Sequence, residues 1–506
     1  MGINRRTFLM AAGLSATGAI AACATGTSGA PPPTTTTLPA TTATAPKPID
    51  YRALAGKLAG HVVTPDAAGY DLARQSYNPL YDGRRPAAIA QCANTSDVQA
   101  CVEAAVAAHT PIAARSGGHS YAGYSTPDDT LVVDLAGLSD VRVDGETAVV
   151  GAGTRLIDVY ARLAAAGRCL PAGSCPSVGV AGLTLGGGIG VLSRKYGLTC
   201  DRLTSATVVT ADGQARTVSA GTDPDLFWAL RGGGGGNFGI VTSFSFTTVP
   251  APQLTAFQIN YSQLNYNAVG DAFGAWQPWI AAAPNELWSN FNITGGPAPT
   301  CTIAGCYVGP AGPVNAMLNT LVAKAGAPTY RTVQTMSYLD AMRHFAGCAT
   351  KSMATCQAQT HGAQWNREPF RATSRMLTAP LHDPAKLVDI TTGHPNMHVI
   401  IDALGGAVSS LSATDTAFPH RTALASIQIY LKTTPATAAN ATTQVTMVRD
   451  QLIPLVGTAA YVNYIDATTP NWPQSYYGDN LLRLRQVAQT YDPTNTFTFP
   501  QAINHT

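Results

Sequence analysis

Short hydrophobic runs alternate with polar residues along the first half of the chain, a pattern typical of a mixed α+β fold. A helix is predicted where apolar residues recur at helical spacing from Val98 to Val106, behind Thr95 or Ser96 as the N-cap. Strand-like runs occupy residues 87–92, 111–115, 131–135, 147–151 and 206–210.

The proline-rich stretch Pro250-Ala251-Pro252 interrupts this pattern. Beyond it, longer helical and strand signals alternate to about Arg449. The end of the chain predicts a strand from about Tyr461, a helix over residues 480–490 and an extended tail. We therefore expect three structural segments, at residues 51–250, 251–455 and 456–506.

The extreme N-terminus predicts targeting rather than folding. Arg5-Arg6 precedes a small-residue apolar run, so residues 1–23 resemble a twin-arginine export signal, and Cys23 ends a lipoprotein-like cleavage box. Residues 24–50 are rich in Thr, Pro and Ala and predict a tether. We expect export to the cell surface or beyond, with a membrane tether through lipidated Cys23; simple signal cleavage is the alternative.

Composition and cysteine content limit the kinds of partner, disulfide and metal site that we expect. Of 506 residues, 45% are hydrophobic and only 12% are charged, with 31 Lys and Arg against 29 Asp and Glu, which argues against nucleic acid as a partner. Ten cysteines suit an oxidising compartment and permit up to four disulfides once Cys23 and Cys175 are set aside. Cys301 with Cys306 and Cys348 with Cys356 are close in sequence, but the connectivity stays open. No metal-ligand spacing is present, so no metal site is expected.

Two glycine-rich segments could hold an anionic or flat ligand. The first runs from Arg115 through Ser116, Gly117, Gly118 and His119 to Ser120, after a predicted strand, where backbone N–H groups can approach a pyrophosphate. An ordinary glycine turn with an exposed histidine is the alternative. The second surrounds Cys175 and continues through a run of glycines that leaves a backbone-lined trough, and here a structural thiol is the alternative. Its glycines include Gly179, Gly182, Gly187, Gly188 and Gly190.

A third segment contains a misleading match. Gly234 to Gly239 fits G-x-G-x-x-G, but a helical pattern precedes it and the strand-like run 240–246 follows. A dinucleotide fingerprint needs the opposite order, strand then helix, so a nicotinamide-binding Rossmann domain is not expected.

Taken together, these segments resemble the berberine bridge enzyme-like group of the vanillyl-alcohol oxidase flavoprotein family. The resemblance also covers the ordered motifs at residues 228–234, 418–421, 461–466 and 476–493. It implies a two-part PCMH-type FAD-binding lobe, and a substrate lobe with an antiparallel sheet covered by helices. It further implies FAD held by two covalent bonds, from His119 to the 8α-methyl and from Cys175 to C6 of the isoalloxazine ring. The pyrophosphate would lie against residues 115–120, and the lining would add the glycines above, Gly236, Gly239, Ile240 and Asn463.

The same resemblance assigns roles on the substrate side. Tyr464 would be the general base that takes a hydroxyl proton while a hydride leaves for the flavin, helped by a nearby cation or hydrogen-bond donors, with Tyr461 the next candidate. Gln428 lies near a catalytic glutamate of some relatives, and its amide cannot act as a base. Val178 would stand where dioxygen approaches the ring. The alternatives are a packed valine, and a tyrosine that only lines the core or the flavin.

We therefore expect an FAD-linked oxidase that acts on an alcohol carbon of a saccharide or secondary metabolite, with dioxygen giving H2O2. The alternatives are a dehydrogenase using a quinone or other carrier, and a non-catalytic tethered binding protein. Tryptophans at helical spacing are expected in the core rather than in a sugar-stacking platform: Trp276, Trp279, Trp288 and Trp365.

Overall fold

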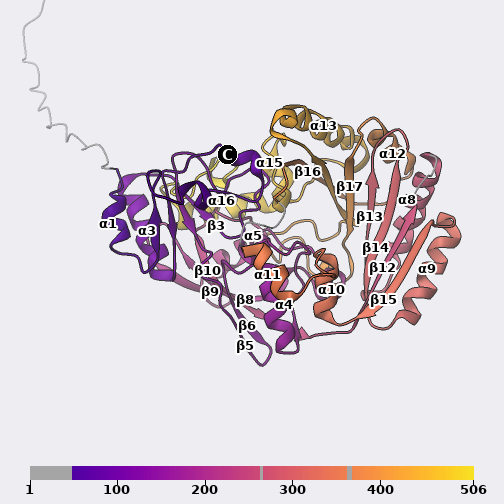
Figure 1. Cartoon of the computed structure of the whole chain (residues 1–506), viewed down its shortest axis with the longest axis horizontal. Coiled ribbons are helices and arrows are strands. Elements are labelled where there is room, and N and C mark those ends of the chain that lie inside the picture. The colour runs from indigo at the N-terminus through magenta and orange to yellow at the C-terminus, as the bar shows by residue number, and fades with distance from the viewer. Residues whose placement is uncertain (1–47, 262–265, 362–366, 506) are drawn as a thin grey trace, which may run out of the picture. The chain divides into compact units, whose positions relative to one another are not determined.

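The computed structural model describes residues 48–261, 266–361 and 367–505. The signal-like segment, Cys23 and nearly all of the tether lie outside these residues, so the expectations for them stay predictions. From Pro46 onward the chain packs as one compact unit. Figure 1 shows it as two sheet-containing parts joined by crossing segments.

The first part begins with a four-stranded sheet in the order β1-β2-β4-β3. Parallel pairing joins β2 to β4 and β4 to β3, because helix α3 (Thr95–Ala108) carries the chain across between β2 and β3. The predicted apolar stripe of α3 is buried, but its N-cap is Asn94, whose side chain accepts from the Asp97 N–H. The strands are β1 (His61–Val63), β2 (Ala88–Gln91), β4 (Leu131–Asp134) and β3 (Ile112–Arg115).

A second sheet of five antiparallel strands lies beside it, in the order β5-β6-β10-β8-β9. Its central strand follows the G-x-G-x-x-G match, and helix α7 (Pro224–Ala229) precedes that match. This helix-then-strand order confirms that the match is not a Rossmann fingerprint. The strands are β5 (Val141–Asp144), β6 (Thr147–Gly151), β10 (Ile240–Thr247), β8 (Leu203–Val209) and β9 (Ala215–Ser219).

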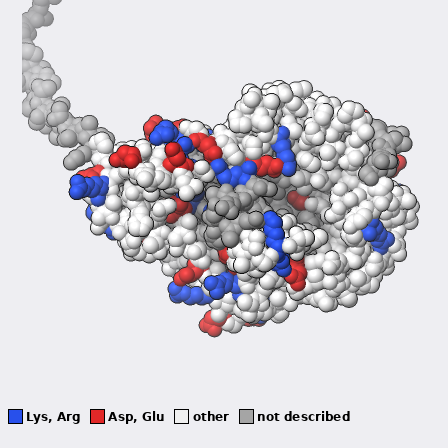
Figure 2. Space-filling model, in the orientation of Figure 1, with Lys and Arg blue, Asp and Glu red and all other residues white. Residues whose placement is uncertain are grey.

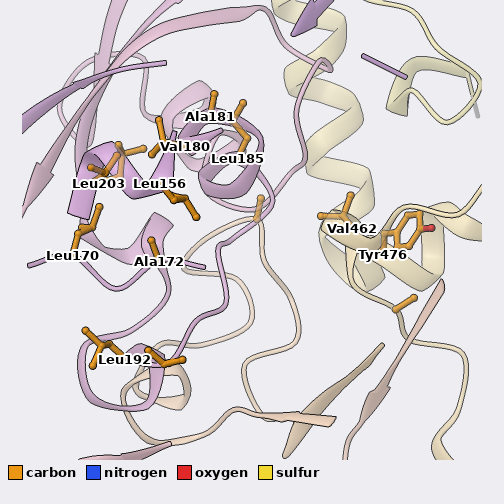
Figure 3. Close-up of a cluster of buried hydrophobic side chains, with 14 of the residues drawn as sticks. Leu156, Leu170, Ala172, Val180, Ala181, Leu185, Leu192, Leu203, Val462 and Tyr476 are labelled. Carbon is orange, nitrogen blue, oxygen red and sulfur yellow. The ribbon is translucent and has the colours of Figure 1, made fainter. Parts of the chain in front are cut away.

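Residues on both sides of Cys175 in the chain pack in an apolar core (Figure 3). Helices α4 (Leu156–Ala165) and α5 (Val180–Leu185) flank the segment around Cys175 and bury their apolar faces in this core. Burial of such side chains stabilises by roughly 1.5–3 kcal/mol each. The cluster includes Leu156, Leu170, Ala172, Val180, Ala181, Leu185, Leu192 and Leu203.

The second part is a seven-stranded antiparallel sheet, as expected for the substrate lobe, in the order β15-β12-β14-β13-β17-β18-β16. Helices α8 (Tyr266–Ala281), α9 (Ala311–Ala325), α12 (Ala385–Thr392) and α13 (Ala438–Gln451) cover the face turned away from the first part (Figure 1). The strands are β15 (Tyr330–Met336), β12 (Leu254–Tyr261), β14 (Thr300–Val308), β13 (Leu287–Thr294), β17 (Met397–Ala403), β18 (Ala425–Lys432) and β16 (Phe370–Leu377).

Alternation along the strands gives this sheet one apolar and one polar face. On β18, Ile427 and Ile429 point into the helix-covered core, so Gln428 and Tyr430 point the other way. On the neighbouring strand β17, Asp402 lies on the same side as Gln428, because Ile400 pairs with Gln428 and Asp402 with Ser426. The polar face of the sheet is therefore turned toward the first part of the molecule.

The C-terminal segment returns to the first part, and one expectation for it is wrong. Residues 462–464 form a short 3-10 turn, η5 (Val462–Tyr464), rather than a strand, because the Tyr464 N–H bonds back to the Tyr461 carbonyl. The predicted helix is present as α16 (Leu481–Tyr491), after α15 (Trp472–Tyr477). Among the described residues, no helix combines the length and apolar character needed to cross a membrane.

Cysteine pairing is settled by geometry. Cys348 and Cys356 form a disulfide between α10 (Tyr338–Phe345) and α11 (Met353–His361). Cys301 and Cys306 both lie on β14, five residues apart and so on opposite faces of the sheet, and neither is bonded.

On the described part of the face in Figure 2, acidic and basic residues lie intermixed.

Candidate functional site

One cavity of about 370 Å³ brings the separate sequence motifs together. It lies where the glycine-rich segments of the first part meet the polar face of the seven-stranded sheet and the C-terminal segment. Tyr430 and Phe370 line it from the sheet, and Val462 lines it from the C-terminal segment. The predicted site residues on its lining are Ser116, Gly117, Gly118, His119, Ser120, Cys175, Val178, Gly179, Gly182, Gly236, Gly239, Ile240, Asn463 and Tyr464.

His119 and Cys175, expected as the two flavin ligands, meet through a third side chain. The Ser177 hydroxyl lies 2.9 Å from His119 Nε2 and 3.8 Å from Cys175 Sγ. The His119 ring also stacks on Tyr77, with centroids 3.8 Å apart and planes 17° from parallel. Two nucleophilic side chains that are 56 positions apart in the chain are thus held at one side of one cavity.

The surroundings keep the imidazole neutral. Burial, with the nearby Arg155 cation, lowers the pKa of His119 to about 3, so its ring carries a free lone pair at neutral pH. Burial raises the pKa of the Cys175 thiol, while hydrogen bonds from Ser177 and Val178 and the Arg155 charge act in the opposite direction. A neutral imidazole can attack an electrophile directly, whereas Cys175 must first ionise, which its hydrogen bonds and the Arg155 charge favour.

The residues present fit a flat, largely apolar cofactor. A Cβ added to Gly182 would meet nothing within 4 Å, and one added to Gly236 would approach only Phe499 at 3.6 Å. Side chains at these two positions would therefore extend into space that glycine leaves open. Backbone on two sides, aromatic rings and two nucleophiles form a lining suited to an isoalloxazine ring with its ribityl chain.

Five predicted site residues lie outside this lining, so their expected roles stay predictions. Arg115 pairs with Asp134 at 2.6 Å and is 6% exposed, so its charge is already neutralised within the sheet. Gly187, Gly188 and Gly190 lie where the packing is tight: an added Cβ would press on the Phe418 ring and would collide with the Thr199 side chain and the Ala172 carbonyl, respectively. The fifth, Gln428, donates a hydrogen bond to the hydroxyl of Tyr121, which lines the cavity.

Tyr464 belongs to a small aromatic group at the sheet side of the cavity. Its ring lies parallel to that of Tyr121, which in turn accepts a 2.6 Å hydrogen bond from the Gln428 amide. The expected help from a cation is wrong for the described residues. Burial, followed by the Asp402 charge, raises the pKa of Tyr464 well above its ordinary value, so the phenol is protonated at neutral pH.

Asp402 is a buried titratable residue whose charge acts on Tyr464, and the sequence did not reveal it. Burial raises the pKa of its carboxyl to about 6, although a hydrogen bond from Asn290 acts in the opposite direction. No motif surrounds it in the sequence. Only strand alternation on β17 could have placed it on the polar face, once the strand register was known.

Tyr461 has a structural role instead. Its hydroxyl oxygen accepts hydrogen bonds from the Gly188 N–H at 3.0 Å and from the Asn463 amide at 2.8 Å. The Asn463 amide also donates to the carbonyl of Leu183, which lines the cavity, so this amide links Tyr461 to the lining. Burial raises the pKa of Tyr461 to about 12 although these donors act in the opposite direction, and Tyr461 is not among the residues that line the cavity.

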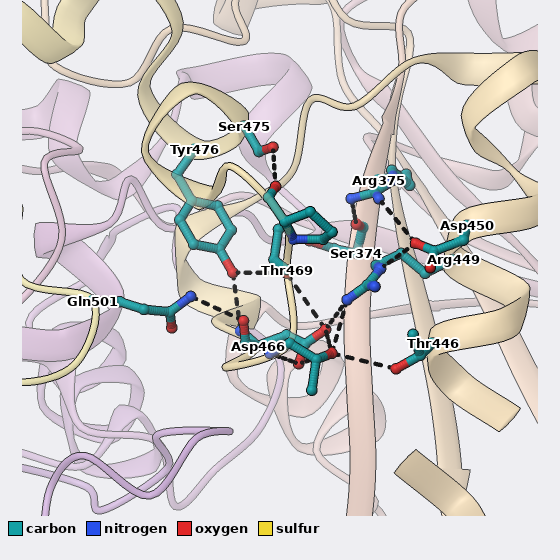
Figure 4. A network of polar contacts seen from close by, with 12 residues as sticks. Ser374, Arg375, Thr446, Arg449, Asp450, Asp466, Thr469, Ser475, Tyr476 and Gln501 are labelled. Atoms are coloured by element: carbon teal, nitrogen blue, oxygen red, sulfur yellow. Dashed lines mark hydrogen bonds and ion pairs between the residues drawn. The ribbon is translucent and has the colours of Figure 1, made fainter. Parts of the chain in front are cut away.

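A buried polar network fixes the segment that carries Tyr464 (Figure 4). Two residues after Tyr464, the Asp466 carboxylate accepts a 2.8 Å bond from Arg449, which is 1% exposed. The Asp466 backbone is held as well: its N–H donates to the Tyr476 hydroxyl and its carbonyl accepts from Gln501. Arg449 belongs to α13 of the sheet part, so this network ties the tyrosine to both parts of the molecule.

The tryptophans form core rather than a platform. Trp276 is fully buried and donates to Ser289, and Trp288 is 5% exposed. Trp279 packs partly buried against the same core, and its indole N–H donates to the Met317 carbonyl. Trp365 lies outside the described residues.

Two family profiles match the chain at the places where the site is built. The profile of the FAD binding domain matches residues 86–219, and that of berberine and berberine-like proteins matches residues 460–504. The first includes His119 and Cys175, and the second includes Tyr464.

Relatives that match most of the chain agree with these two profiles. An uncharacterized FAD-linked oxidoreductase of Bacillus subtilis, YgaK, is 35% identical over 88% of this chain and 97% of its own length. The chitooligosaccharide oxidase of Gibberella zeae is 32% identical over 83% of this chain and 87% of its own. The solved structure of a Physcomitrella patens protein, BBE-like 1, superposes with a TM-score of 0.83 at 30% identity, covering 90% of this chain and 98% of that one. The chain therefore belongs to the berberine bridge enzyme-like family of FAD-dependent oxidoreductases.

Proposed function

We propose that this protein is a bicovalent flavin oxidase that oxidises an alcohol carbon of a saccharide and passes the electrons to dioxygen. The observation that carries the proposal is the placement of His119, Cys175 and Tyr464 on the lining of one cavity, which Phe370 and Tyr430 of the sheet also line. Bound FAD would supply the acceptor for the hydride.

The residues of the chain would handle the proton. An alcohol becomes a hydride donor as its hydroxyl proton leaves, which requires a positioned acceptor. Tyr464 holds its own proton at neutral pH, so its oxygen would take the substrate proton as the phenolic proton leaves, and Asp402, a carboxylate at neutral pH with its pKa of about 6, is the nearby group that would receive that second proton. Tyr121 and Gln428 keep the Tyr464 ring in place.

The sheet face favours a hydroxyl-rich substrate. Asn290, Asn292 and Asp402 lie on neighbouring positions of β13 and β17. Among the described residues, the buried Asn292 Oδ1 has no hydrogen-bond partner, and a buried acceptor of this kind is costly unless a ligand donates to it. The names of the relatives from Gibberella zeae and Thermothelomyces thermophilus, a chitooligosaccharide oxidase and a xylooligosaccharide oxidase, support a saccharide substrate.

Dioxygen is the proposed electron acceptor, with H2O2 as product. Val178 lies on the cavity lining three positions after Cys175. Its side chain is one methylene smaller than that of leucine, which leaves room for a diatomic molecule beside the ring. The twin-arginine-like residues 1–23 and Cys23 support export and a lipid tether as part of the same proposal.

Denaturation tests the proposed linkage directly. Flavin should stay with the polypeptide through acid precipitation and appear, by mass spectrometry, on the two peptides that carry His119 and Cys175. His119→Ala and Cys175→Ala should each retain one bond, and the double variant none. Cys306→Ala, which removes a buried thiol on β14, is the matched control and should keep both. Free flavin in the supernatant of the denatured wild-type protein would refute the double linkage.

A further inference from the structure

We propose that Ser177 is a positioning residue for flavin attachment, whose single hydroxyl prepares both His119 and Cys175 as nucleophiles. The inference rests on the proposed bicovalent flavin and concerns the reaction that attaches the flavin to the protein. It starts from one geometric fact: the Ser177 Oγ contacts His119 Nε2 at 2.9 Å and Cys175 Sγ at 3.8 Å.

The hydroxyl is held rigidly in that position. Ser177 is 5% exposed, and its carbonyl accepts a 2.9 Å bond from the Arg155 guanidinium. The carbonyls on either side of it, of Pro176 and Val178, accept bonds from the first backbone N–H groups of α4 at 3.2 and 3.0 Å. Three successive carbonyls are therefore anchored to the start of one helix, which leaves the serine side chain little freedom.

The direction of the two hydrogen bonds follows from the form in which the Cys175 sulfur reacts. A hydroxyl has one proton to donate. If Ser177 donates that proton to Cys175, it favours the thiolate, which is the nucleophilic form. It must then accept from His119, so the imidazole proton is on Nε2 and the lone pair of the neutral ring is on Nδ1. One chain of donation, from His119 to Ser177 to Cys175, thus makes both groups ready to attack.

Each attachment removes two hydrogens overall. At Cys175 the S–H bond and a ring C–H bond break as the S–C bond forms. At His119 an N–H bond and a methyl C–H bond break as the C–N bond forms. The two electrons and two protons released at each position pass to dioxygen, giving one H2O2 per bond. Ser177 is unchanged by either step: its hydroxyl accepts a hydrogen bond from the Nε2 proton of His119 and donates one to the Cys175 sulfur.

The experiment measures the rate at which flavin becomes covalently attached, rather than the rate of catalysis. Full-length apoprotein, produced in riboflavin-starved cells, is mixed with FAD under air, and covalent flavin on each of the two peptides is followed by mass spectrometry. Ser177→Ala should slow attachment at Cys175 by about tenfold or more, the effect of losing a hydrogen bond to a developing charge. Its rate should also need a higher pH, because the thiol loses a donor that favours ionisation.

Two variants separate chemistry from folding. Ser177→Thr keeps the hydroxyl and should restore attachment to within a few-fold of the wild type. Ser205→Ala, on β8 away from the cavity, should attach flavin normally. Unchanged rates and pH dependence in Ser177→Ala would overturn the assignment, as would equal impairment in Ser177→Thr. Wild-type protein that gains no covalent flavin would instead overturn the proposed function itself.

Discussion

Tyr121 lies flat against Tyr464, with ring centroids 5.4 Å apart and planes 10° from parallel. The stack holds the Tyr464 ring whether or not its hydroxyl is present, so Tyr464→Phe should leave the site intact while removing the proton acceptor. We expect unchanged flavin content and flavin reduction slower by roughly 10²-fold or more, measured by anaerobic stopped-flow. Tyr330→Phe, at an exposed tyrosine on β15, is the control. An unchanged reduction rate in Tyr464→Phe would place the base elsewhere.

Asp402 should set the acidic limb of the pH profile. Its pKa is raised to about 6, so the carboxyl is protonated below that pH and can no longer accept the proton that leaves Tyr464. The rate of flavin reduction should therefore fall as the pH drops through about 6, and Asp402→Asn should be slow with this limb abolished. Asp389→Asn, exposed on α12, serves as the control. A limb that persists in Asp402→Asn would assign it to another group.

Val178 should govern access of dioxygen. Val178→Leu adds one methylene beside the proposed ring position, so reoxidation by oxygen should slow by roughly tenfold while anaerobic reduction by substrate is spared. Val178→Ala should reoxidise at least as fast as the wild type. Reduced wild-type enzyme that recovers its oxidised spectrum only over many minutes would favour a dehydrogenase instead.

Acid should destabilise the protein through buried histidines. Burial lowers the pKa of His420 to about 4 from 6.5, while its Nε2 donates to the Ala460 carbonyl. The unfolded chain therefore binds this proton first, and stability falls as the pH drops from about 6.5 toward 4, by at most about 3 kcal/mol from this residue. His420→Gln keeps a donor but cannot titrate. Urea unfolding between pH 4 and 7 should show a shallower pH dependence in the variant than in the wild type.

Local sequence determined much of the fold and the family. The strands at residues 87–92 and 147–151, the stripe of α3 and the order of helix and strand around Gly234 depend on neighbours a few positions apart, and these expectations are confirmed. His119 and Cys175 could be singled out for the same reason, since each lies in a glycine-rich motif whose form is visible without tertiary contacts. The error at residues 461–464 arose because an alternating pattern predicts a strand, whereas no neighbouring strand pairs there.

Only the tertiary structure decided which side chains share the site. Asp402 and Tyr121 meet Tyr464 through packing between segments far apart in the chain, and Arg115 is removed from the cavity by its pairing with Asp134. Ser177 shows the same limit at short range: it lies two positions from Cys175, but its contact with His119, 58 positions away, depends on how two loops pack. Patterns along a chain report the burial of each residue, whereas a site is made of distances between residues, and those are set by the packing of the whole fold.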